Sequence, residues 1–328
     1  SGRGRTEQDL CADTGKGGRW AIRGAVEANK RNGNKIITTM VEHASVKSPM
    51  KYLENQGCEV TYLPVDEYGV VSIDALKEAM SEDTILVSIM YVNNEVGAIE
   101  PVEEIGKYIK SVNKNVIYHV DAIQAFGKLE IKPRKSNIDV LTVSGHKIHG
   151  PKGTGFMYLK KNAKVNPFIL GGGQQEGMRS GTENVPGIAG IGQAAKDCYD
   201  NLQENVSKMT ELKDYLIDSL QTIDGVTINS RKGAEGAPHV VSASFSGVRS
   251  EVLLHALEDK GVYISAGSAC SSNKPAISET LKAMGIGKDL LGSTVRFSFC
   301  KDNTKEEIDY AVEQLKQMLP ILRKYVRR

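Results

Sequence analysis

A lysine flanked by two histidines and three glycines comes directly after an apolar run. The segment SGHKIHGPKG (144–153) follows IDVLTV (138–143). Its glycine spacing does not make a P-loop, because a proline stands where that loop needs a lysine. At the carboxyl end of a strand, Lys147 could act as a Schiff-base nucleophile, or it could be an ordinary solvated lysine of a loop.

The two histidines beside this lysine raise the question of a metal site. His146 and His149 are three residues apart and could share one face of a helix as metal ligands. No acidic side chain or third imidazole nearby completes such a site. We therefore expect no bound metal at this segment.

A carboxylate stands inside a second apolar segment, VIYHVDAIQAFGK (116–128). An unpaired Asp121 at this place would be costly, so we expect it to have a cationic partner. It could cap a following helix. Alternatively, it could face the protonated pyridine nitrogen of a pyridoxal cofactor, so that the ring remains an electron sink. Gln124 could then reach a nearby ring substituent.

Short apolar, β-branched runs alternate with helical patterns through the first two thirds of the chain. They predict strands at 35–43, 84–92, 115–122 and 138–144. This alternation is typical of an α/β protein with a mainly parallel sheet covered on both faces, in which ligands bind beyond the carboxyl ends of the strands. A run at 154–161 follows a Gly/Pro-rich turn and predicts a strand that enters from another direction.

The last third of the chain has a different pattern. A long amphipathic pattern from Ile188 to Ile223 could bridge two domains, and shorter strands interleaved with helices follow it. We predict a large domain over residues 1–203, with an atypical or truncated N-terminal segment, and a smaller α+β domain over residues 204–328. Residues 1–20 show no clear periodicity and are predicted to form a loop.

The composition excludes several classes of protein. The 42 basic and 40 acidic side chains give a formal charge of +2, so no strong field favours nucleic acid or anionic lipid. The five scattered cysteines argue against a disulfide framework and for a reducing compartment. Because no apolar run approaches the roughly 18 residues of a membrane span, and the start is unlike a signal peptide, we predict a soluble, cytoplasmic protein.

One cysteine has an unusual context. Most free cysteines are small buried hydrophobic residues, an interpretation that suits Cys58, Cys198 and Cys300. Cys270 lies in SAGSACSSNKP (265–275), a run of small residues between a predicted strand and a predicted helix, so we expect its thiol to be exposed. Since a thiol with a pKa of about 8.5 is mostly protonated at neutral pH, the site or the substrate must assist its deprotonation.

Four further polar residues are candidates on weaker local signals. Arg296 alternates with apolar residues in STVRFSF (293–299), which keeps its guanidinium off the core; it could be a solvated arginine or bind a carboxylate. His43, at the end of TTMVEH, could be a core or capping histidine. Asn94 in YVNNEVG and Thr182 in MRSGTENV are residues typical of turns.

Four separated segments together resemble the cysteine desulfurases, the NifS- and IscS-like enzymes of the class V aminotransferase family, which serve iron–sulfur cluster assembly and tRNA thiolation. The segments are HVDAIQAFGK, SGHKIHGPKGTG, GGGQQEGMRSGTENV and SAGSACSS. The resemblance runs from about Trp20 to the C-terminus. It implies the pyridoxal phosphate fold type I: a large domain with a mainly parallel, seven-stranded sheet, and a smaller C-terminal domain that carries the catalytic cysteine.

The resemblance also implies a role for each residue near the cofactor ring. Lys147 would bind pyridoxal phosphate covalently, and Asp121 would face its pyridinium nitrogen. Gln124 would hydrogen-bond the ring hydroxyl, and His43 would stack on the ring. Asn94 would lie near the ring and the carboxylate of the substrate.

Other residues would hold the cofactor phosphate and the substrate. By the same resemblance, Ser144 and His146 would bind the phosphate, and Thr182 would reach the phosphate of the partner subunit, which makes the active unit a homodimer. Arg296 would clamp the α-carboxylate of the substrate. Thr6-Glu7 is similar to a Thr-Glu pair of the family's phosphate loop but stands too far from AIRGA (21–25), so we expect that loop to be expanded, altered or absent.

The implied reaction removes sulfur from L-cysteine. Lys147 would act as base at the α-carbon, and the thiolate of Cys270 would attack the substrate sulfur, which gives L-alanine and a persulfide for an acceptor protein. His43 or His146 would move protons. An aminotransferase or a selenocysteine lyase on the same scaffold would not necessarily need Cys270, and a degenerate sulfur-relay partner would need no cofactor.

Overall fold

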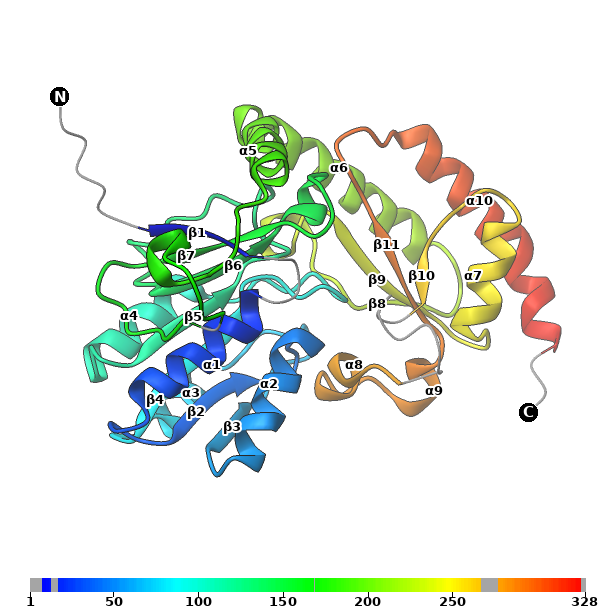
Figure 1. Cartoon of the computed structure of the whole chain (residues 1–328). Coiled ribbons are helices and arrows are strands. Elements are labelled where there is room, and N and C mark those ends of the chain that lie inside the picture. Colours follow the sequence, from blue (N-terminus) through cyan, green and yellow to red (C-terminus); the bar gives the residue numbers. More distant parts are fainter. Residues whose placement is uncertain (1–7, 13–16, 168, 267–276, 326–328) are drawn as a thin grey trace. The chain divides into compact units, whose positions relative to one another are not determined.

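The structure is a computed structural model that describes residues 8–12, 17–167, 169–266 and 277–325 (Figure 1). The chain divides into two compact units. The first unit comprises Ser1–Pro64, Val71–Val92 and Glu100–Leu202, and the second comprises Val65–Val70, Asn93–Ile99 and Gln203–Arg328. The sequence predicted a single boundary after residue 203. In the structure, the second unit also contains two short segments from the first half of the chain.

The first unit contains a seven-stranded sheet. Its strands lie in the order β1-β7-β6-β5-β4-β2-β3. Neighbours from β3 to β6 pair in parallel, and β7 is antiparallel to both β6 and β1. The predicted mainly parallel sheet is therefore confirmed. The strand predicted after the Gly/Pro-rich turn is β7, and it runs opposite to the parallel strands, as expected. The strands are β1 (Gln8–Ala12), β2 (Lys35–Thr39), β3 (Glu59–Leu63), β4 (Thr84–Met90), β5 (Ile117–Asp121), β6 (Val140–Ser144) and β7 (Gly155–Leu159).

The N-terminal part corrects the sequence analysis. Residues 1–20 were predicted to form a loop, but β1 pairs along its whole length with β7, from Gln8 opposite Leu159 to Ala12 opposite Gly155. The prediction was wrong because a short strand at the edge of a sheet is held by backbone hydrogen bonds to a distant partner, and its own sequence need not alternate. A helix also begins inside this range, at Gly17.

Helices cover both faces of this sheet. Ile117 and Tyr118 are neighbours in β5 and therefore point to opposite faces. Ile117 packs in one core cluster with Trp20 and Met50, which lie on α1 and α2. Tyr118 lies under α4 and donates to the carbonyl of Val102 at 3.3 Å. The helices of this unit are α1 (Gly17–Asn29), α2 (Ala44–Asn55), α3 (Ile73–Ala79), α4 (Val102–Val112) and α5 (Val185–Asp200).

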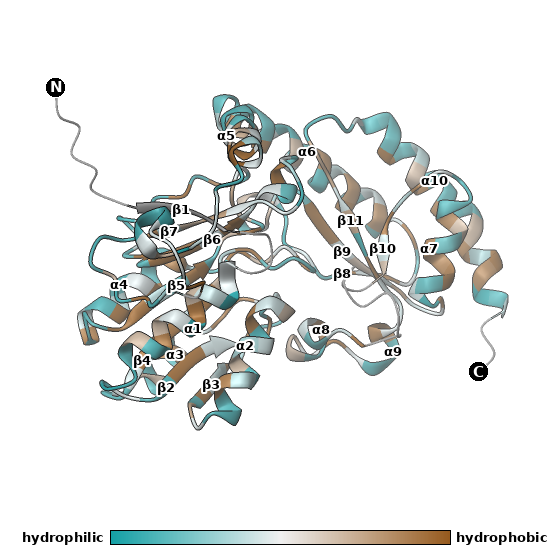
Figure 2. Cartoon of the chain, viewed as in Figure 1, coloured by the Kyte–Doolittle hydropathy of each residue, from teal (hydrophilic) through white to brown (hydrophobic). Residues whose placement is uncertain are grey.

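The second unit contains a four-stranded antiparallel sheet in the order β10-β11-β9-β8. Its strands are β8 (Val226–Ile228), β9 (Val240–Phe245), β10 (Ser265–Ala266) and β11 (Thr294–Ser298). Its helices are α6 (Leu202–Gln221), α7 (Ser250–Glu258), α8 (Glu279–Ala283), α9 (Lys288–Leu291) and α10 (Lys305–Leu322). Figure 2 shows brown and teal stretches alternating along α10, as expected for a helix with one buried face.

The long amphipathic pattern from Ile188 to Ile223 forms two helices rather than one. Helix α5 ends before Asn201, and α6 begins directly after it. The apolar face of the second helix is buried at Met209, Leu212 and Leu216. None of the helices in the described ranges is long and apolar enough to cross a membrane.

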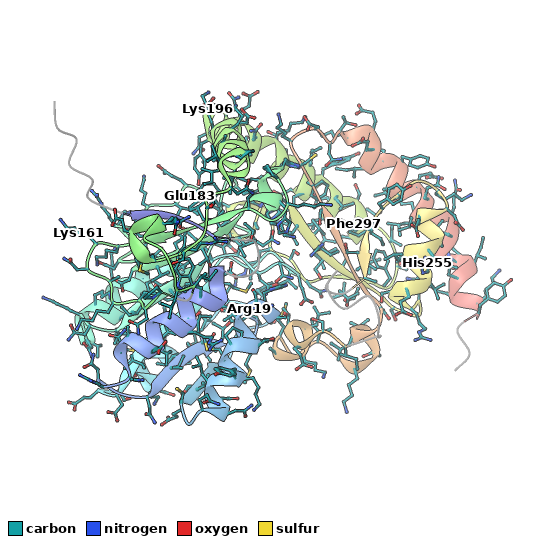
Figure 3. The ribbon with its side chains drawn as sticks, in the orientation of Figure 1. Arg19, Lys161, Glu183, Lys196, His255 and Phe297 are labelled. Atoms are coloured by element: carbon teal, nitrogen blue, oxygen red, sulfur yellow. The ribbon has the colours of Figure 1, made fainter. Side chains whose placement is uncertain are left out.

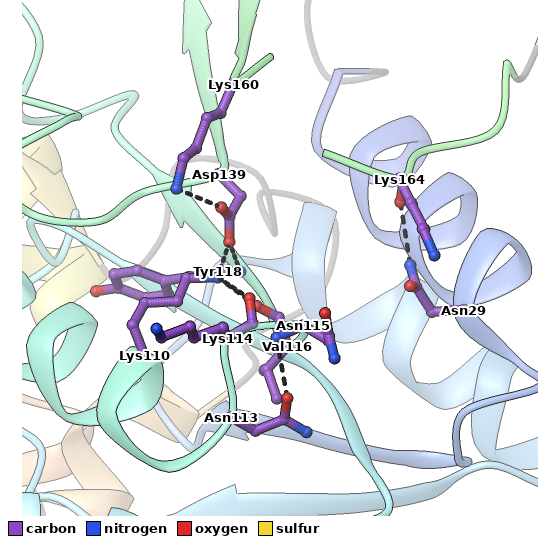
Figure 4. Close-up of polar contacts among 10 residues, drawn as sticks. All are labelled: Asn29, Lys110, Asn113, Lys114, Asn115, Val116, Tyr118, Asp139, Lys160 and Lys164. Atoms are coloured by element: carbon purple, nitrogen blue, oxygen red, sulfur yellow. Dashed lines mark hydrogen bonds and ion pairs between the residues drawn. The ribbon is translucent and has the colours of Figure 1, made fainter. Parts of the chain in front are cut away.

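An ion-pair cluster around the buried Asp139 fixes the amino ends of β5 and β6 (Figure 4). The carboxylate of Asp139, just before β6, accepts hydrogen bonds from Lys110 and from the amide of Tyr118, the latter at 2.9 Å. Lys160 pairs with its other oxygen at 3.3 Å. Lys110 also donates to the carbonyl of Val116 at 2.6 Å, and burial lowers the pKa of its ammonium group. The cluster therefore connects the end of α4 with three strands.

Replacement of Asp139 by alanine should destabilise the protein strongly. It leaves the partly buried Lys110 without its carboxylate, and breaking a buried pair in this way costs about 3 kcal/mol. Urea unfolding should show this loss in the free energy of unfolding. The control is Glu130→Ala, which breaks an exposed pair with Lys132 and should cost less than about 1 kcal/mol. Equal losses in the two variants would contradict the assignment.

Candidate active site

The carboxyl ends of four parallel strands meet at one edge of the first unit's sheet. Strands β2, β4, β5 and β6 end there, and their backbone register places Met90 opposite Asp121 and Asp121 opposite Thr142. Six residues that the sequence predicted as cofactor ligands end these strands or follow them closely. They are His43, Asp121, Gln124, Ser144, His146 and Lys147.

Asp121 is a buried carboxylate. Its side chain is 5% exposed, and Oδ1 accepts a hydrogen bond from the amide of Ile123 at 3.0 Å. Burial raises its pKa to about 6, and the Ile123 bond only partly opposes this shift. In the part of the chain that the structure describes, no lysine or arginine forms an ion pair with it. The alternative of a helix cap is wrong, because residues 122–127 form turns and not a helix.

The lysine of the opening motif lies on a short 3-10 turn, Gly145–Ile148. The side chains of His146 and Lys147 are exposed, and burial followed by the charges of nearby lysines lowers the pKa of His146. Glycine is required at position 145, because a Cβ there would meet the hydroxyl of Thr154 at 2.6 Å. The turn ends at His149 in the left-handed conformation, with φ 63°. The small residues of the motif thus allow close packing under the lysine.

A second lysine supports this turn, which the sequence analysis did not foresee. Lys128 Nζ donates to the backbone carbonyl of Lys147 at 2.9 Å. Burial lowers the pKa of Lys128 to about 8; the charge of Cys198 opposes this shift and that of Lys147 adds to it. A cation at the end of a helical turn stabilises its last carbonyls. The bond therefore fixes the peptide that follows Lys147.

His43 is the N-cap of α2. Its Nδ1 accepts a hydrogen bond from the amide of Ser45 at 3.1 Å and lies 2.8 Å from the hydroxyl of the same serine. Because a backbone amide can only donate, the neutral ring carries its proton on Nε2. The capping alternative is confirmed. The predicted stacking role is compatible with it, since a cap uses the edge of the ring and not its face.

The structure adds Glu42, a buried acid that the sequence analysis missed. Its side chain is 3% exposed, and Oε1 accepts from the amide of Met90 at 2.8 Å and from the hydroxyl of Thr39 at 3.0 Å. Burial raises its pKa well above the ordinary value, and the charge of Asp121 adds to the shift. These hydrogen bonds connect the turn before His43 to the end of β4. The raised pKa favours the neutral form of the Glu42 side chain.

His119 is a second buried polar residue without a predicted role. It precedes Asp121 by two positions on β5 and is fully buried. Its Nδ1 lies 2.8 Å from the hydroxyl of Ser88, and its Nε2 lies 3.2 Å from that of Thr142. Burial lowers its pKa to about 3, so the ring is neutral. It connects β4, β5 and β6 directly behind the sheet edge.

Arg296 and Asn94 lie together in the second unit. Arg296 is on β11, where its neighbours Val295 and Phe297 are buried, so the predicted alternation is confirmed. Phe297 is labelled in Figure 3. One guanidinium nitrogen donates to the backbone carbonyl of Asn94 at 2.7 Å, and the other to the hydroxyl of Ser265 at 3.2 Å. The guanidinium is thus oriented by a turn and by strand β10.

Thr182 and Cys270 were also predicted as site residues. Thr182 is exposed in the loop before α5 and lines a small pocket with Gln175 and Arg179. Cys270 lies outside the described residues. The three cysteines predicted to be buried, Cys58, Cys198 and Cys300, are only half-buried. Within the described ranges, no three His, Cys, Asp or Glu side chains are grouped so that they could hold a metal ion.

Comparison with known proteins assigns the family. Residues 13–311 match the family model described as Aminotransferase class-V. A "Cysteine desulfurase IscS" of Clostridium botulinum (strain Hall) is 42% identical over 302 residues, 92% of this chain and 76% of that protein. The same-named protein of Methanosarcina thermophila is 41% identical over 304 residues, 93% of this chain and 74% of that protein.

Solved structures agree with this result. One titled "NIFS-LIKE PROTEIN" superposes with a TM-score of 0.88 and 36% identity, over 96% of this chain and 83% of that one. The chain therefore belongs to the class V aminotransferase family. Within that family, several curated relatives that match most of the chain are named cysteine desulfurase.

Asp121→Asn should stabilise the cofactor-free protein at neutral pH. The pKa of about 6 lies above the unfolded value of about 3.9, so the folded state holds the proton more tightly, and this contribution is lost as pH rises through about 6. Above that pH the ionised group costs up to about 3 kcal/mol, which asparagine avoids. Urea unfolding at about pH 7.5 and about pH 4 should show the gain only at the higher pH.

The control for this experiment is the exposed Asp302. Its replacement by asparagine should leave the free energy of unfolding nearly unchanged at both pH values, because an exposed carboxylate loses little solvation on folding. A stabilisation by Asp121→Asn that is the same at the low and the high pH would show that the charge of the carboxylate is not its cause.

Proposed function

We propose that this protein is a pyridoxal phosphate-dependent cysteine desulfurase, which converts L-cysteine to L-alanine and holds the sulfur as a persulfide on Cys270. The observation that carries the proposal is Asp121, a buried carboxylate at the sheet edge without a cationic partner among the described residues. A protonated pyridine nitrogen would supply that cation. The identity of 42% to relatives named cysteine desulfurase supports the same chemistry.

The residues of the first unit fit pyridoxal phosphate. Lys147 would hold it covalently on the turn that Lys128 supports, and Asp121 would face the ring nitrogen. Gln124, half-buried three positions further, would hydrogen-bond the ring hydroxyl. His43, which caps α2 through the edge of its imidazole, would stack with its face on the cofactor ring.

The phosphate and the substrate would be held by the remaining residues. Ser144, at the end of β6, and His146 would bind the cofactor phosphate. Asn94 and Arg296, which contact each other in the second unit, would bind the substrate, with the guanidinium on its α-carboxylate. We further propose a homodimer in which the exposed Thr182 reaches the cofactor phosphate of the partner subunit.

The chemistry divides between cofactor and protein. When bound, pyridoxal phosphate supplies an electron sink for the α-carbon of the substrate. Lys147 would remove the α-proton, for which its amine must be uncharged. The charge of Lys147 contributes to the lowered pKa of the nearby Lys128. Asp121 as a carboxylate would keep the ring nitrogen protonated.

Sulfur transfer requires a thiolate on Cys270. The thiolate would attack the sulfur of the bound cysteine, so that a new S–S bond forms while the C–S bond of the substrate breaks. The electron pair stays on the substrate carbon, which takes a proton to give alanine. The step therefore needs no external oxidant. The persulfide would then pass its sulfur to an acceptor protein of iron–sulfur cluster assembly or tRNA thiolation, in the cytoplasm.

The test is an absorbance spectrum of the protein, loaded with pyridoxal phosphate, before and after addition of L-cysteine, together with an assay of alanine and sulfide. The cofactor band of the wild type should change, and alanine should form. Lys147→Ala should lose the lysine-dependent band and lower the rate at least about a hundredfold. Cys270→Ala should keep the resting spectrum and lose alanine formation.

Two results would contradict the proposal. Undiminished alanine formation by Cys270→Ala would favour a lyase or aminotransferase that does not use this thiol. A wild-type protein without any cofactor band after addition of pyridoxal phosphate would favour the cofactor-free sulfur-relay alternative.

A further inference from the structure

The turn between β2 and α2 carries a buried acid to which the proposed reaction assigns no role. Glu42 is 3% exposed, and it directly precedes His43, the N-cap of α2. Its Oε1 accepts a hydrogen bond from the amide of Met90 at 2.8 Å and a second one from the hydroxyl of Thr39 at 3.0 Å. One oxygen atom thus connects the last residue of β2 with the last residue of β4.

The bond to Met90 connects the two strands beyond their paired backbones. The last register pair of β2 and β4 is Ile37 with Val87, three residues before Met90. Strand β2 ends two residues after this pair, and the chain then turns into α2. The carboxyl group of Glu42 therefore supplies an acceptor at the end of β4, where the backbone of β2 has already ended.

The hydroxyl of Thr39 is oriented for its bond to Glu42. Its oxygen accepts from the amide of Val41 at 3.3 Å, and because that amide can only donate, the hydroxyl proton is available for Oε1. The turn from Thr39 to Glu42 is thus closed by its own hydrogen bonds, and the amide of Met90 attaches it to β4. His43 follows directly, so the position of its ring depends on this attachment.

On its other side, the end of β4 is bound to the strand that carries Asp121. Met90 lies opposite Asp121 in the register of β4 and β5. The amide of the next residue, Tyr91, donates to the carbonyl of Asp121 at 2.8 Å. Two consecutive amides are therefore held by Glu42 and by Asp121. A displacement of the turn from β4 would change the position of His43 relative to Asp121.

The surroundings of Glu42 suit a neutral carboxyl group. Both donors meet Oε1, while Oε2 is buried and has no hydrogen-bond partner among the described residues. An unpaired buried oxygen is less costly in a neutral group than in a charged one. Burial raises the pKa of Glu42 well above its ordinary value, although the bonds from Met90 and Thr39 oppose this shift. Glutamine, which is neutral and has the same shape, should therefore replace this acid.

We infer that Glu42 is a positioning residue of the proposed cofactor site: it holds the turn that carries His43 on the end of β4 and so sets the place of the imidazole relative to Asp121. The inference rests on the proposed function, in which His43 stacks on the cofactor ring and Asp121 faces the nitrogen of that ring. Glu42 acts through the amide of Met90 and not by contact with the cofactor.

The first measurement uses the cofactor-free protein. Hydrogen–deuterium exchange is followed by NMR on protein with a nitrogen isotope label in methionine only, which limits the spectrum to the 9 methionines of the chain. The exchange rate of the Met90 amide is divided by that of Met157, which lies in β7, so that global unfolding does not affect the result. Glu42→Ala should raise this ratio about tenfold, because the amide loses its acceptor.

Two further variants test the acceptor itself. Glu42→Gln keeps an oxygen that can accept from Met90, so its exchange ratio should stay within about threefold of the wild type. Glu42→Met has a similar volume and no acceptor, and it should behave as Glu42→Ala does. Because it leaves no large cavity, it keeps the inference testable if the alanine variant does not fold.

The second measurement is the dissociation constant of pyridoxal phosphate. It is obtained from the absorbance change when the cofactor is titrated into the cofactor-free protein. Glu42→Ala and Glu42→Met should raise this constant about tenfold, because His43 is no longer held in place. Glu42→Gln should stay within about threefold of the wild type. Such a rescue would assign the effect to the hydrogen-bond acceptor and not to a charge.

Two controls change carboxylates at the opposite end of the sheet. Asp139→Ala removes a buried acceptor of backbone and side-chain bonds at the amino ends of β5 and β6. It should lower the stability but leave the exchange ratio and the cofactor affinity unchanged. Glu59→Ala removes an exposed carboxylate of β3 that pairs with Lys35, and it should match the wild type in both measurements.

The outcomes separate the inference from the proposed function. If the wild type shows no cofactor band, the proposed function fails. If the wild type binds the cofactor and the variants without an acceptor bind it equally tightly, the inference is wrong. An unchanged exchange ratio in those variants would also overturn it. So would a glutamine variant as weak in cofactor binding as the alanine variant, because the acceptor would then not be what positions His43.

Discussion

The arrangement of the first unit depends on one buried negative charge. Asp121 ends a central strand, and removal of its carboxylate from water makes ionisation unfavourable. Among the residues that the structure describes, no lysine or arginine forms an ion pair with it. The ring of His119 is neutral, and Glu42 favours its protonated form. Interaction of the Asp121 carboxylate with a cationic ring nitrogen would offset the cost of burying it.

The sequence predicted the parts of this site that depend on local pattern. Apolar runs followed by Asp121 and Lys147 located the strand ends, because the carboxyl ends of parallel strands share one edge. Resemblance added roles for His43 and Arg296, which local pattern alone left open. The alternation around Arg296 was sufficient to place its side chain outside the core.

Other features could not be predicted because they depend on residues far apart in the chain. Strand β1 exists through its pairing with β7. Glu42 and His119 look like interruptions of apolar runs, and only the neighbouring strands supply their hydrogen-bond partners. Glu95 meets Ser278 across 183 positions. The visible signal in each case was a polar residue in an apolar or turn context, but the sequence does not identify its partner.

Strands β5 and β6 have different tasks at their two ends. The Asp139 cluster holds their amino ends together with α4 and β7, while the residues for which we propose chemical roles lie at or after their carboxyl ends. Loss or exchange of a reactive group thus leaves the anchoring cluster intact. Over evolutionary time, such a scaffold can change the reaction that it performs without first having to acquire a new way to fold.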